Sequence, residues 1–563
     1  MKVVIVGGVA GGATAAARIR RLNEGAEIVA FERSGYISYA NCGLPYYIGD
    51  VITDPDELTL QTPRSFYSRF RVDMRVKHEV TAINPERKTV SVTNLESGVS
   101  FEESYDKLIL SPGAKAAVPN VSGVDSDKIF SLRTVEDTFK IKNYINENNV
   151  RSAVMIGGGF ISVELAENLR ELGLDVTIVQ RPKQLMNPYD SDMAAFIHSE
   201  VRKHGVRLCL GHHVAGFEER DGGVDVLIQN AAPIHADIAV LAIGVEPDTA
   251  LAKQAGLALG MKNSILVNDR METSVPDIYA VGDAVQVKNF VTGEDTLIPL
   301  AGPANKQGRI AADNICGGDS HYKGTQGSSV IKIFDLTAAS TGINEKNAKK
   351  AGLDVDKVIL SPMSHAGYYP GGKVMTMKVI FEKESYRLLG AQIIGYEGVD
   401  KRIDVLATAI RCGMKATELK DLELAYAPPY SSAKDPVNMA GYMADNVAKG
   451  VLKQWFVEDE KDLPRDGSVV LLDTRTVREF SRGHVEGFTN IPVDELRERI
   501  GEVEKGKPVY VICQSGLRSY ISCRILAGYG YDAYNFAGGF RFYDAVTNDQ
   551  CLIERALPCG MDL

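Results

Sequence analysis

Two glycine-rich turns, each between a short apolar strand and a helix, constrain the fold of this chain more than any other feature. The first turn reads GGVAGG, after a strand at 2–6 and before a helix at 13–22, and the next strand, 28–31, ends in Glu32. Glycines let the backbone approach a pyrophosphate, the helix N-terminus favours its charge, and the acid accepts from a ribose hydroxyl. The pattern predicts a dinucleotide-binding βαβ unit, although Val9 replaces the usual middle glycine. The residues predicted to hold this dinucleotide are Gly7, Gly8, Gly11, Gly12 and Glu32.

The second turn reads GGGFIS and follows an apolar strand at 153–156, so a second nucleotide-binding unit is expected. Ser162 replaces its third glycine, a small-for-small change. The next strand ends in Gln180 and Arg181, where an NADH site usually has an acid. Without that acid the 2′-phosphate of NADPH meets no repulsion, and Arg181 could pair with it. We therefore expect the site to accept NADPH as well as NADH. The alternative is that Arg181 is a solvated arginine at the end of the strand. The residues predicted to contact this dinucleotide are Gly157, Gly159, Gln180 and Arg181.

Length and composition narrow the class of protein. A chain of 563 residues with 45% hydrophobic and 24% charged residues is globular and long enough for several domains. Its net charge of −10 argues against nucleic-acid binding, and it has no zinc-ligand spacing, so no metal is expected. No apolar run has the length of a membrane span, and the N-terminus reads as a strand rather than a signal peptide. Eight scattered cysteines fit a reducing cytoplasm better than a disulfide framework.

One cysteine, Cys42, follows the first nucleotide-binding unit and is a candidate redox thiol. It lies in SYANCGLPYY, where Asn41 can cap a helix whose first turn carries Cys42, and a helix N-terminus lowers the pKa of a thiol. The alternative is a buried cysteine that packs as a small hydrophobe. Thr14, Arg18 and Arg21 share one face of the first helix, because they lie at i, i+4 and i+7. That face is either solvated or a phosphate clamp for a substrate near Cys42.

A later segment, 273–284, reads TSVPDIYAVGDA and looks like the second flavin segment of two-dinucleotide-domain flavoproteins, with Asp283 at the ribityl and phosphate region. Over about residues 1–445 the chain resembles the pyridine nucleotide-disulfide reductases, which implies FAD and a nicotinamide cofactor. Most of that superfamily carries a CxxxxC pair, but here the fifth position after Cys42 is Tyr47. An internal disulfide at the flavin is therefore excluded. The single-cysteine subgroup remains, with its coenzyme A-disulfide reductases, NADH oxidases and NADH peroxidases.

Three segments resemble the coenzyme A-disulfide reductases best, at 38–45, 365–371 and 425–435. The resemblance implies a homodimer in which two tyrosines reach the other subunit's cysteine; they map to Tyr368 and Tyr426, with Tyr369 as the alternative register. A family histidine falls on Asn305 and a family lysine falls near 70–71, so some contacts with coenzyme A are expected to differ. The family's coenzyme A contacts map to Thr14, Arg18, Arg21, Ser38, Asn41 and Lys434.

The C-terminal part carries a second candidate cysteine. An apolar strand delivers the loop CQSGLR, from Cys513 to Arg518, directly before a helix, and the amides of such a loop stabilise a thiolate or a persulfide. This part resembles a rhodanese domain over about residues 460–547, and its six-residue loop has the sulfurtransferase length. A structural cysteine is the alternative. The tail contains Cys551 and Cys559. Its role stays open between a relay of exposed thiols and an arm that only packs against the rest of the chain.

These observations predict an α/β chain with two dinucleotide-binding (Rossmann-like) domains, an α+β dimerisation domain and a C-terminal α/β rhodanese domain. The FAD-binding domain is expected to be interrupted by the NAD(P)-binding domain, and a charged segment before the rhodanese domain is expected to be a linker. The expected bounds are 1–112 and 241–326 for FAD binding, 113–240 for NAD(P) binding, 327–445 for dimerisation, 446–465 for the linker, 466–547 for rhodanese and 548–563 for the tail.

The function expected from these sites is the reduction of small disulfides, persulfides or polysulfides by NAD(P)H through FAD, in a cytoplasmic homodimer. Cys42 would attack a sulfur of coenzyme A disulfide or coenzyme A persulfide as a thiolate, and Tyr368 and Tyr426 would orient the leaving thiol or stabilise its charge. Cys513 would carry sulfane sulfur. Two alternatives stay open: an NADH oxidase or peroxidase that cycles Cys42 through sulfenic acid, and a sulfur-carrier or redox-sensing protein.

Overall fold

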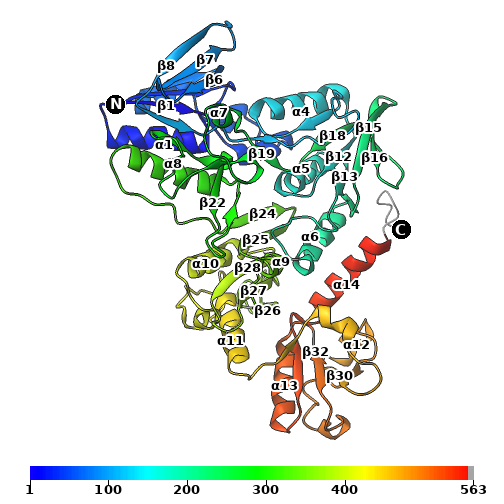
Figure 1. Cartoon of the computed structure of the whole chain (residues 1–563). Helices are drawn as coiled ribbons and strands as arrows, with labels where there is room; N and C mark the ends of the chain where they lie inside the picture. Colours follow the sequence, from blue (N-terminus) through cyan, green and yellow to red (C-terminus); the bar gives the residue numbers. More distant parts are fainter. Residues whose placement is uncertain (556–563) are drawn as a thin grey trace. The chain divides into compact units, whose positions relative to one another are not determined.

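The computed structural model of the protein describes residues 1–555, and Cys559 lies outside them. The chain divides into two units, one formed by 1–181 with 205–327 and the other by 182–204 with the chain from 328 onward. Figure 1 shows the elements of both units in sequence colours.

The first unit begins with a parallel sheet of five strands in the order β21-β9-β1-β2-β5. In the pair β1–β2, Val6 lies opposite Phe31, so the first glycine turn leaves from the carboxyl end of the sheet. Helix α1 is rich in alanine, a small and strongly helix-forming residue, and packs closely against the sheet and α8. The bounds are β1 Lys2–Val6, β2 Glu27–Glu32, β5 Asp73–Val76, β9 Lys107–Leu110, β21 Ile278–Ala280, α1 Ala10–Leu22 and α8 Ala301–Ile315.

The same unit holds a second five-stranded parallel sheet, in the order β11-β18-β12-β13-β14. Its strands are almost continuously apolar, as expected for a parallel sheet covered on both faces. Figure 1 shows α4 and α5 beside it. The bounds are β11 Ile129–Ser131, β12 Ser152–Ile156, β13 Asp175–Gln180, β14 Arg207–Leu210, β18 Ile238–Leu241, α4 Val135–Asn148 and α5 Phe160–Glu171.

Smaller sheets and short helices complete the first unit. Antiparallel sheets are formed by β6 His78–Asn84, β7 Thr89–Asn94 and β8 Ser100–Ser104, and by β15 Val214–Arg220, β16 Gly223–Ile228 and β17 Ile234–Ala236. Shorter pairings join β3 Ile37–Tyr39 to β4 Thr59–Gln61, β10 Ala114–Ala116 to β19 Val245–Pro247, and β22 Val285–Lys288 to β20 Ile265–Leu266 and β23 Asp295–Thr296. The short helices are α2 Leu44–Ile48, α3 Pro63–Phe70 and α7 Ala250–Gln254.

The second unit contains an antiparallel sheet in the order β24-β25-β28-β27-β26. The Lys378 ammonium is fully buried and ion-paired with Asp190, Asp192 and Glu345, which ties the start of α6 to this sheet. The bounds are α6 Ser191–Lys203, β24 Ser329–Ile333, β25 Leu336–Gly342, α9 Glu345–Lys350, β26 Val355–Leu360, β27 Thr376–Glu382, β28 Leu388–Gly395, α10 Val399–Arg411 and α11 Pro436–Ala448.

The same unit ends in a parallel sheet in the order β29-β33-β32-β30-β31, and α13 packs against β32 and β33. Strand β32 leads into the Cys513 loop at its carboxyl end, where α13 begins. The bounds are β29 Gln454–Trp455, β30 Val470–Asp473, α12 Val477–Ser481, β31 Thr489–Asn490, β32 Val509–Ile512, α13 Leu517–Gly528, β33 Ala533–Phe536 and α14 Gly539–Arg555.

Two of the expected boundaries need correction. The segment 446–465 is not a free linker, because strand β29 within it pairs with β33 and Trp455 is buried against Phe536 and Phe488. The tail expected from 548 begins inside α14, which packs along α6 (Figure 1). Sequence periodicity did not show these contacts, since each depends on an element far away in the chain.

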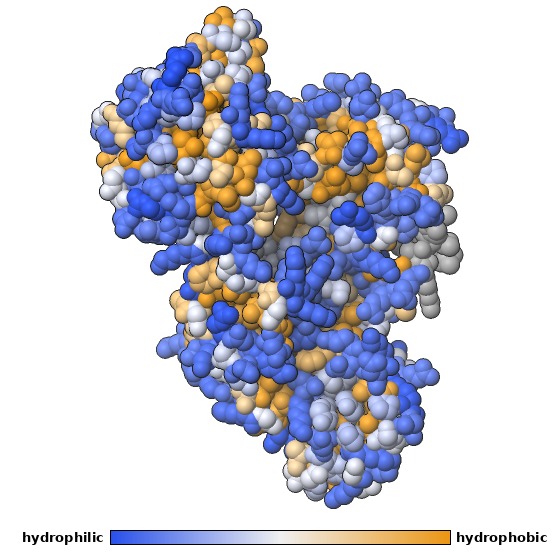
Figure 2. All heavy atoms as spheres, viewed as in Figure 1, coloured by the Kyte–Doolittle hydropathy of each residue, from blue (hydrophilic) through white to orange (hydrophobic). Residues whose placement is uncertain are grey.

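Within the described residues no helix is long and apolar enough to cross a membrane. Hydrophilic residues cover most of the face seen in Figure 2, with apolar residues gathered in patches between them.

Candidate functional site

The first glycine turn has a geometry that only glycine allows. Gly7 has φ +98°, and a Cβ added to Gly12 would lie 1.9 Å from the carbonyl oxygen of Gly7. At the end of β2, the Glu32 carboxylate accepts hydrogen bonds from the backbone N–H groups of Gly8, at 2.9 Å, and Ser34, at 2.9 Å. The predicted acid therefore lies against the turn, as a ribose-binding carboxylate requires.

The second glycine turn has room for a phosphate. A Cβ added to Gly157 would meet the Ala242 carbonyl oxygen at 2.3 Å, whereas one added to Gly159 would meet nothing within 4 Å. Ser162 is buried, and its hydroxyl donates to the carbonyl oxygen of Gly157 at 2.6 Å, so the serine ties the helix to the turn. Both turns thus fit the dinucleotides that the sequence predicts.

Three other predicted cofactor residues occupy different environments. Gln180 is buried at the end of β13, whereas Arg181 is exposed and, among the described residues, has no ion-pair partner. Asp283 lies in a turn after β21 and accepts a hydrogen bond from the Arg133 guanidinium. The structure therefore leaves Arg181 available to an anion.

Cys42 is exposed in a 3₁₀ turn, Asn41–Gly43, that leads into the five-residue helix α2. The expected cap is absent, because the residue before the turn is Ala40 and no side chain caps either helix. The lowered thiol pKa is also wrong: desolvation and the nearby Glu164 carboxylate raise the pKa of Cys42. A helix this short has too few aligned peptides to outweigh those two effects.

Glu164, on α5, is the neighbour of Cys42 that sequence reasoning missed. Burial, and then the neighbouring Glu167 carboxylate, raise the pKa of Glu164 to about 7. Helix α2 approaches α5 so closely that a Cβ on Gly49 would lie 2.2 Å from the Asn168 side-chain oxygen. Only this packing between distant segments brings Glu164 near the thiol.

A cavity between α1 and α8 contains three of the residues predicted to bind coenzyme A. Arg18 pairs with Asp313, with Nε 2.7 Å from Oδ1. Arg21 and Lys306 have no ion-pair partner among the described residues, so the cavity carries excess positive charge. The side chains that line it are Thr14, Arg18, Arg21, Asn305, Lys306 and Arg309.

The remaining predicted coenzyme A residues are more scattered. Ser38 has φ +45°, and its N–H donates to the Gly8 carbonyl oxygen at 2.9 Å, which joins the Cys42 segment to the first glycine turn. Asn41 is exposed beside Cys42. Lys434 is exposed in the second unit and does not line the cavity.

In the second unit, the two predicted tyrosines lie together. The Tyr368 and Tyr426 hydroxyl oxygens are 2.8 Å apart, and both rings are exposed, at 76% and 47%. Tyr369 instead packs edge-on against His365, with ring centroids 5.6 Å apart. The alternative register is therefore disfavoured by geometry.

The Cys513 loop forms a nest around its sulfur. Cys513 is buried, and its Sγ accepts a hydrogen bond from the Gly516 N–H at 3.2 Å and from the Ser519 hydroxyl at 3.1 Å. Arg518 forms two hydrogen bonds with Glu479, at 2.7 and 2.8 Å. These donors can stabilise a thiolate or a persulfide anion, as predicted for this loop type.

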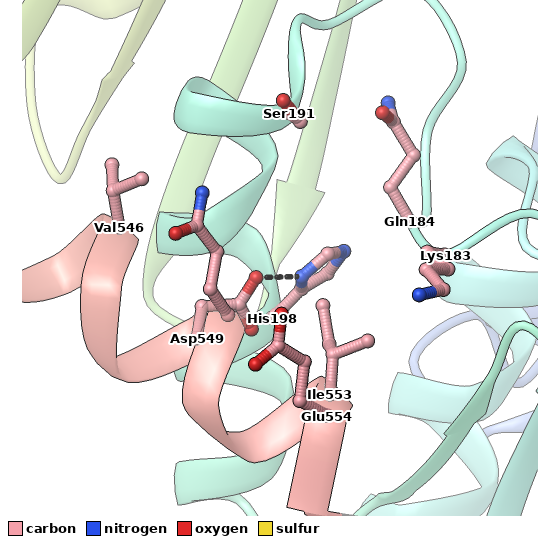
Figure 3. A pocket seen from close by; sticks show the side chains of 9 residues that line it. Lys183, Gln184, Ser191, His198, Val546, Asp549, Ile553 and Glu554 are labelled. Carbon is pink, nitrogen blue, oxygen red and sulfur yellow. Dashed lines mark hydrogen bonds and ion pairs between the residues drawn. The ribbon is translucent and has the colours of Figure 1, made fainter. Parts of the chain in front are cut away.

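A further cavity, shown in Figure 3, lies between α6 and α14 and contains none of the predicted site residues. His198 Nε2 accepts the Leu185 N–H at 2.9 Å, and Nδ1 lies 2.8 Å from the Asp549 carboxylate. Because one ring nitrogen accepts, the other must carry the hydrogen that Asp549 receives. This contact attaches the C-terminal helix to α6.

Comparison with known proteins identifies the family. A family model described as pyridine nucleotide-disulphide oxidoreductase matches residues 1–308, its dimerisation domain matches 328–436, and a rhodanese-like domain matches 457–545. The chain belongs to the pyridine nucleotide-disulphide oxidoreductase family. It is an FAD- and pyridine nucleotide-dependent oxidoreductase with a dimerisation domain and a C-terminal rhodanese-like domain, so the predicted fold class and enzyme class are confirmed.

Individual members of the family resemble the chain over most of its length. A coenzyme A disulfide reductase of Staphylococcus aureus (strain NCTC 8325 / PS 47) is 39% identical over 79% of this chain and 99% of the relative. The crystal structure of reduced Bacillus anthracis CoADR-RHD is 49% identical, with a TM-score of 0.95 over 97% of this chain and 98% of that one. An NAD-dependent persulfide reductase from A. fulgidus is 37% identical, with a TM-score of 0.91 over 96% and 100%.

Proposed function

We propose that this oxidoreductase is a cytoplasmic homodimer that reduces coenzyme A disulfide and coenzyme A persulfide with NAD(P)H, and that its rhodanese domain carries sulfane sulfur on Cys513. The cavity between α1 and α8 supports this proposal most, because its unpaired Arg21 and Lys306 suit the phosphates of coenzyme A. Relatives named for coenzyme A disulfide and persulfide reduction add support.

In the proposed reaction the Cys42 thiolate attacks one sulfur of coenzyme A disulfide. The S–S bond breaks, coenzyme A thiolate leaves, and Cys42 forms a mixed disulfide with the other half. With coenzyme A persulfide, attack on the inner sulfur forms the same mixed disulfide and releases hydrosulfide. FAD, which the first glycine turn and Glu32 would hold, would supply the electron pair, taken from NAD(P)H, for reduction of this mixed disulfide. Tyr368 and Tyr426 of the partner subunit would hold a proton beside the leaving thiolate.

A panel of electron acceptors tests the proposed activity. NAD(P)H oxidation is measured with coenzyme A disulfide, coenzyme A persulfide, hydrogen peroxide and oxygen. The two coenzyme A compounds should give the highest kcat/KM. Dominant turnover of peroxide or oxygen would instead support a cycle through sulfenic acid at Cys42.

Variants of the cavity test the substrate class. Lys306→Ala with Arg309→Ala should raise KM for coenzyme A disulfide at least tenfold, since charge-assisted phosphate contacts are worth roughly 1.5–3 kcal/mol. The same variant should turn over cystine like the wild type. Lys346→Ala with Lys349→Ala removes two exposed lysines of α9 and is the matched control. Equal losses with cystine would contradict coenzyme A binding at this cavity.

A further inference from the structure

The Cys513 loop has two hydrogen-bond donors for one sulfur anion. The Gly516 N–H donates to Sγ at 3.2 Å, and Gly516 has φ +94°, which turns this amide toward the sulfur. The Ser519 hydroxyl lies 3.1 Å from Sγ and 3.1 Å from the Gly516 carbonyl oxygen, so its single hydrogen can turn to the sulfur when that atom is charged.

The loop's arginines already have carboxylate partners. Arg475 and Asp473 are both fully buried, and Nη2 of Arg475 lies 2.8 Å from Oδ2 of Asp473. The Arg475 guanidinium also lies over the Phe540 ring. Arg518 binds both oxygens of Glu479. Each positive charge at the base and the end of the loop is therefore balanced by one negative charge.

Glu479 stays ionised at neutral pH, so this balance persists. The Arg518 hydrogen bonds, which outweigh partial burial, and the Thr476 contacts lower the pKa of Glu479 to about 2. The Glu479 carboxylate also accepts from the Thr476 N–H at 2.9 Å and completes the capping box of α12.

A third arginine, Arg541, contacts the Cys513 loop through its backbone, but its side chain points away from the loop. Its backbone N–H donates to the Gln514 carbonyl oxygen, whereas its guanidinium contacts the Thr376 hydroxyl and lies over the Phe196 ring. It does not supply a free charge to Cys513.

We propose that this loop selects singly charged persulfides as sulfur donors and discriminates against the thiosulfate dianion. The inference rests on the proposed role of Cys513 as a sulfur carrier. Because Cys513 is 0% exposed, a donor must lose water to reach Sγ, and an unbalanced second charge is costly there. The Cys513 thiol passes its proton to the persulfide anion, so that only one negative charge lies in the loop. The resulting thiolate attacks the outer sulfur of the protonated persulfide, the donor's S–S bond breaks, and the donor leaves as a thiolate while Cys513 becomes a persulfide.

The test compares single-turnover sulfur loading of Cys513 from cysteine persulfide and from thiosulfate, followed by intact mass. The full chain carries Cys42→Ser, so that the reductase site does not consume the donor. We expect loading from cysteine persulfide to be at least a hundredfold faster at equal concentration. Equal rates would overturn the inference, whereas no loading from either donor, or loading that survives Cys513→Ser, would overturn the carrier role itself.

Removing the negative charge that pairs with Arg518 should make thiosulfate a better sulfur donor relative to persulfide. Glu479→Gln keeps an oxygen for the capping box but removes the charge, so thiosulfate loading should rise at least tenfold relative to persulfide loading. The matched control is Glu502→Gln, which removes an exposed carboxylate paired with Arg499. An unchanged donor ratio in Glu479→Gln, with the fluorescence of Trp455 like that of the wild type, would contradict selection by this ion pair.

Discussion

The hydroxyl oxygens of Tyr368 and Tyr426 lie 2.8 Å apart, although the two residues are 58 positions apart in the sequence. The hydrogen bond with Tyr426 raises the pKa of Tyr368. Two exposed phenols that share a hydrogen bond can hold a proton at the surface of the dimerisation domain. Such a pair suits contact with a thiol of another subunit.

Replacing either phenol should therefore slow catalysis. Tyr368→Phe and Tyr426→Phe should each lower kcat/KM for coenzyme A disulfide about a hundredfold or more, the range of a single proton-transfer group. The double variant should lose less than the product of the single losses, because the two hydroxyls act as a unit. Tyr430→Phe, at an exposed tyrosine in the same segment, is the control. Fully multiplicative losses would contradict a shared role.

Glu164 should control the protonation of Cys42. Above pH 7 its carboxylate is mostly ionised and disfavours a nearby thiolate. Glu164→Gln should therefore lower the pKa of the Cys42 thiol, which is measured by the pH dependence of iodoacetamide alkylation of the reduced enzyme. Glu171→Gln, at the exposed far end of α5, is the control. A thiol pKa unchanged in Glu164→Gln would show that the two groups do not interact.

The residues at the end of β13 should allow NADPH to bind. Gln180 places no charge opposite a 2′-phosphate, and the exposed Arg181 can pair with it, a contact worth about 1.5–3 kcal/mol or roughly ten- to a hundredfold in affinity. We expect kcat/KM for NADPH to equal or exceed that for NADH, and Gln180→Glu to shift the preference toward NADH. Wild-type enzyme that prefers NADH tenfold or more would show that Arg181 does not serve this purpose.

The contact between Asp549 and His198 should hold α14 on α6. Burial disfavours the charged Asp549, but hydrogen bonds from His198 and Arg202 outweigh burial and keep its pKa below the usual value. This stabilisation is therefore complete above the ordinary carboxyl pKa and is lost as the pH falls through the lowered value. Asp549→Asn should cost about 1.5–3 kcal/mol and expose α14 to limited proteolysis at pH 7. Asp544→Asn, at an exposed position of the same helix, should have neither effect.

Local patterns predicted the parts of the sites that lie within one motif. The glycine turns, Glu32 and the Cys513 loop each need a short strand–turn–helix sequence, and the tyrosine segments were matched through the family. The surroundings of Cys42 were not predictable, because desolvation, and then the Glu164 carboxylate from the second nucleotide-binding unit, raise the thiol pKa that the local sequence suggested would fall. Trp455 shows the same limit, since its charged segment looks like a linker until β33 pairs with it.

The central claim is that Cys42 alone carries the electrons to the substrate, while Cys513 serves only sulfane sulfur. The most direct measurement is NAD(P)H oxidation by Cys42→Ser and Cys513→Ser, each with coenzyme A disulfide and with coenzyme A persulfide, together with the FAD absorbance of each variant. Cys42→Ser should retain FAD and lose both activities, and Cys513→Ser should keep disulfide reduction but lose part of its persulfide turnover. Retention of more than a few per cent of disulfide reduction by Cys42→Ser, or equal losses with both substrates in Cys513→Ser, would contradict this account.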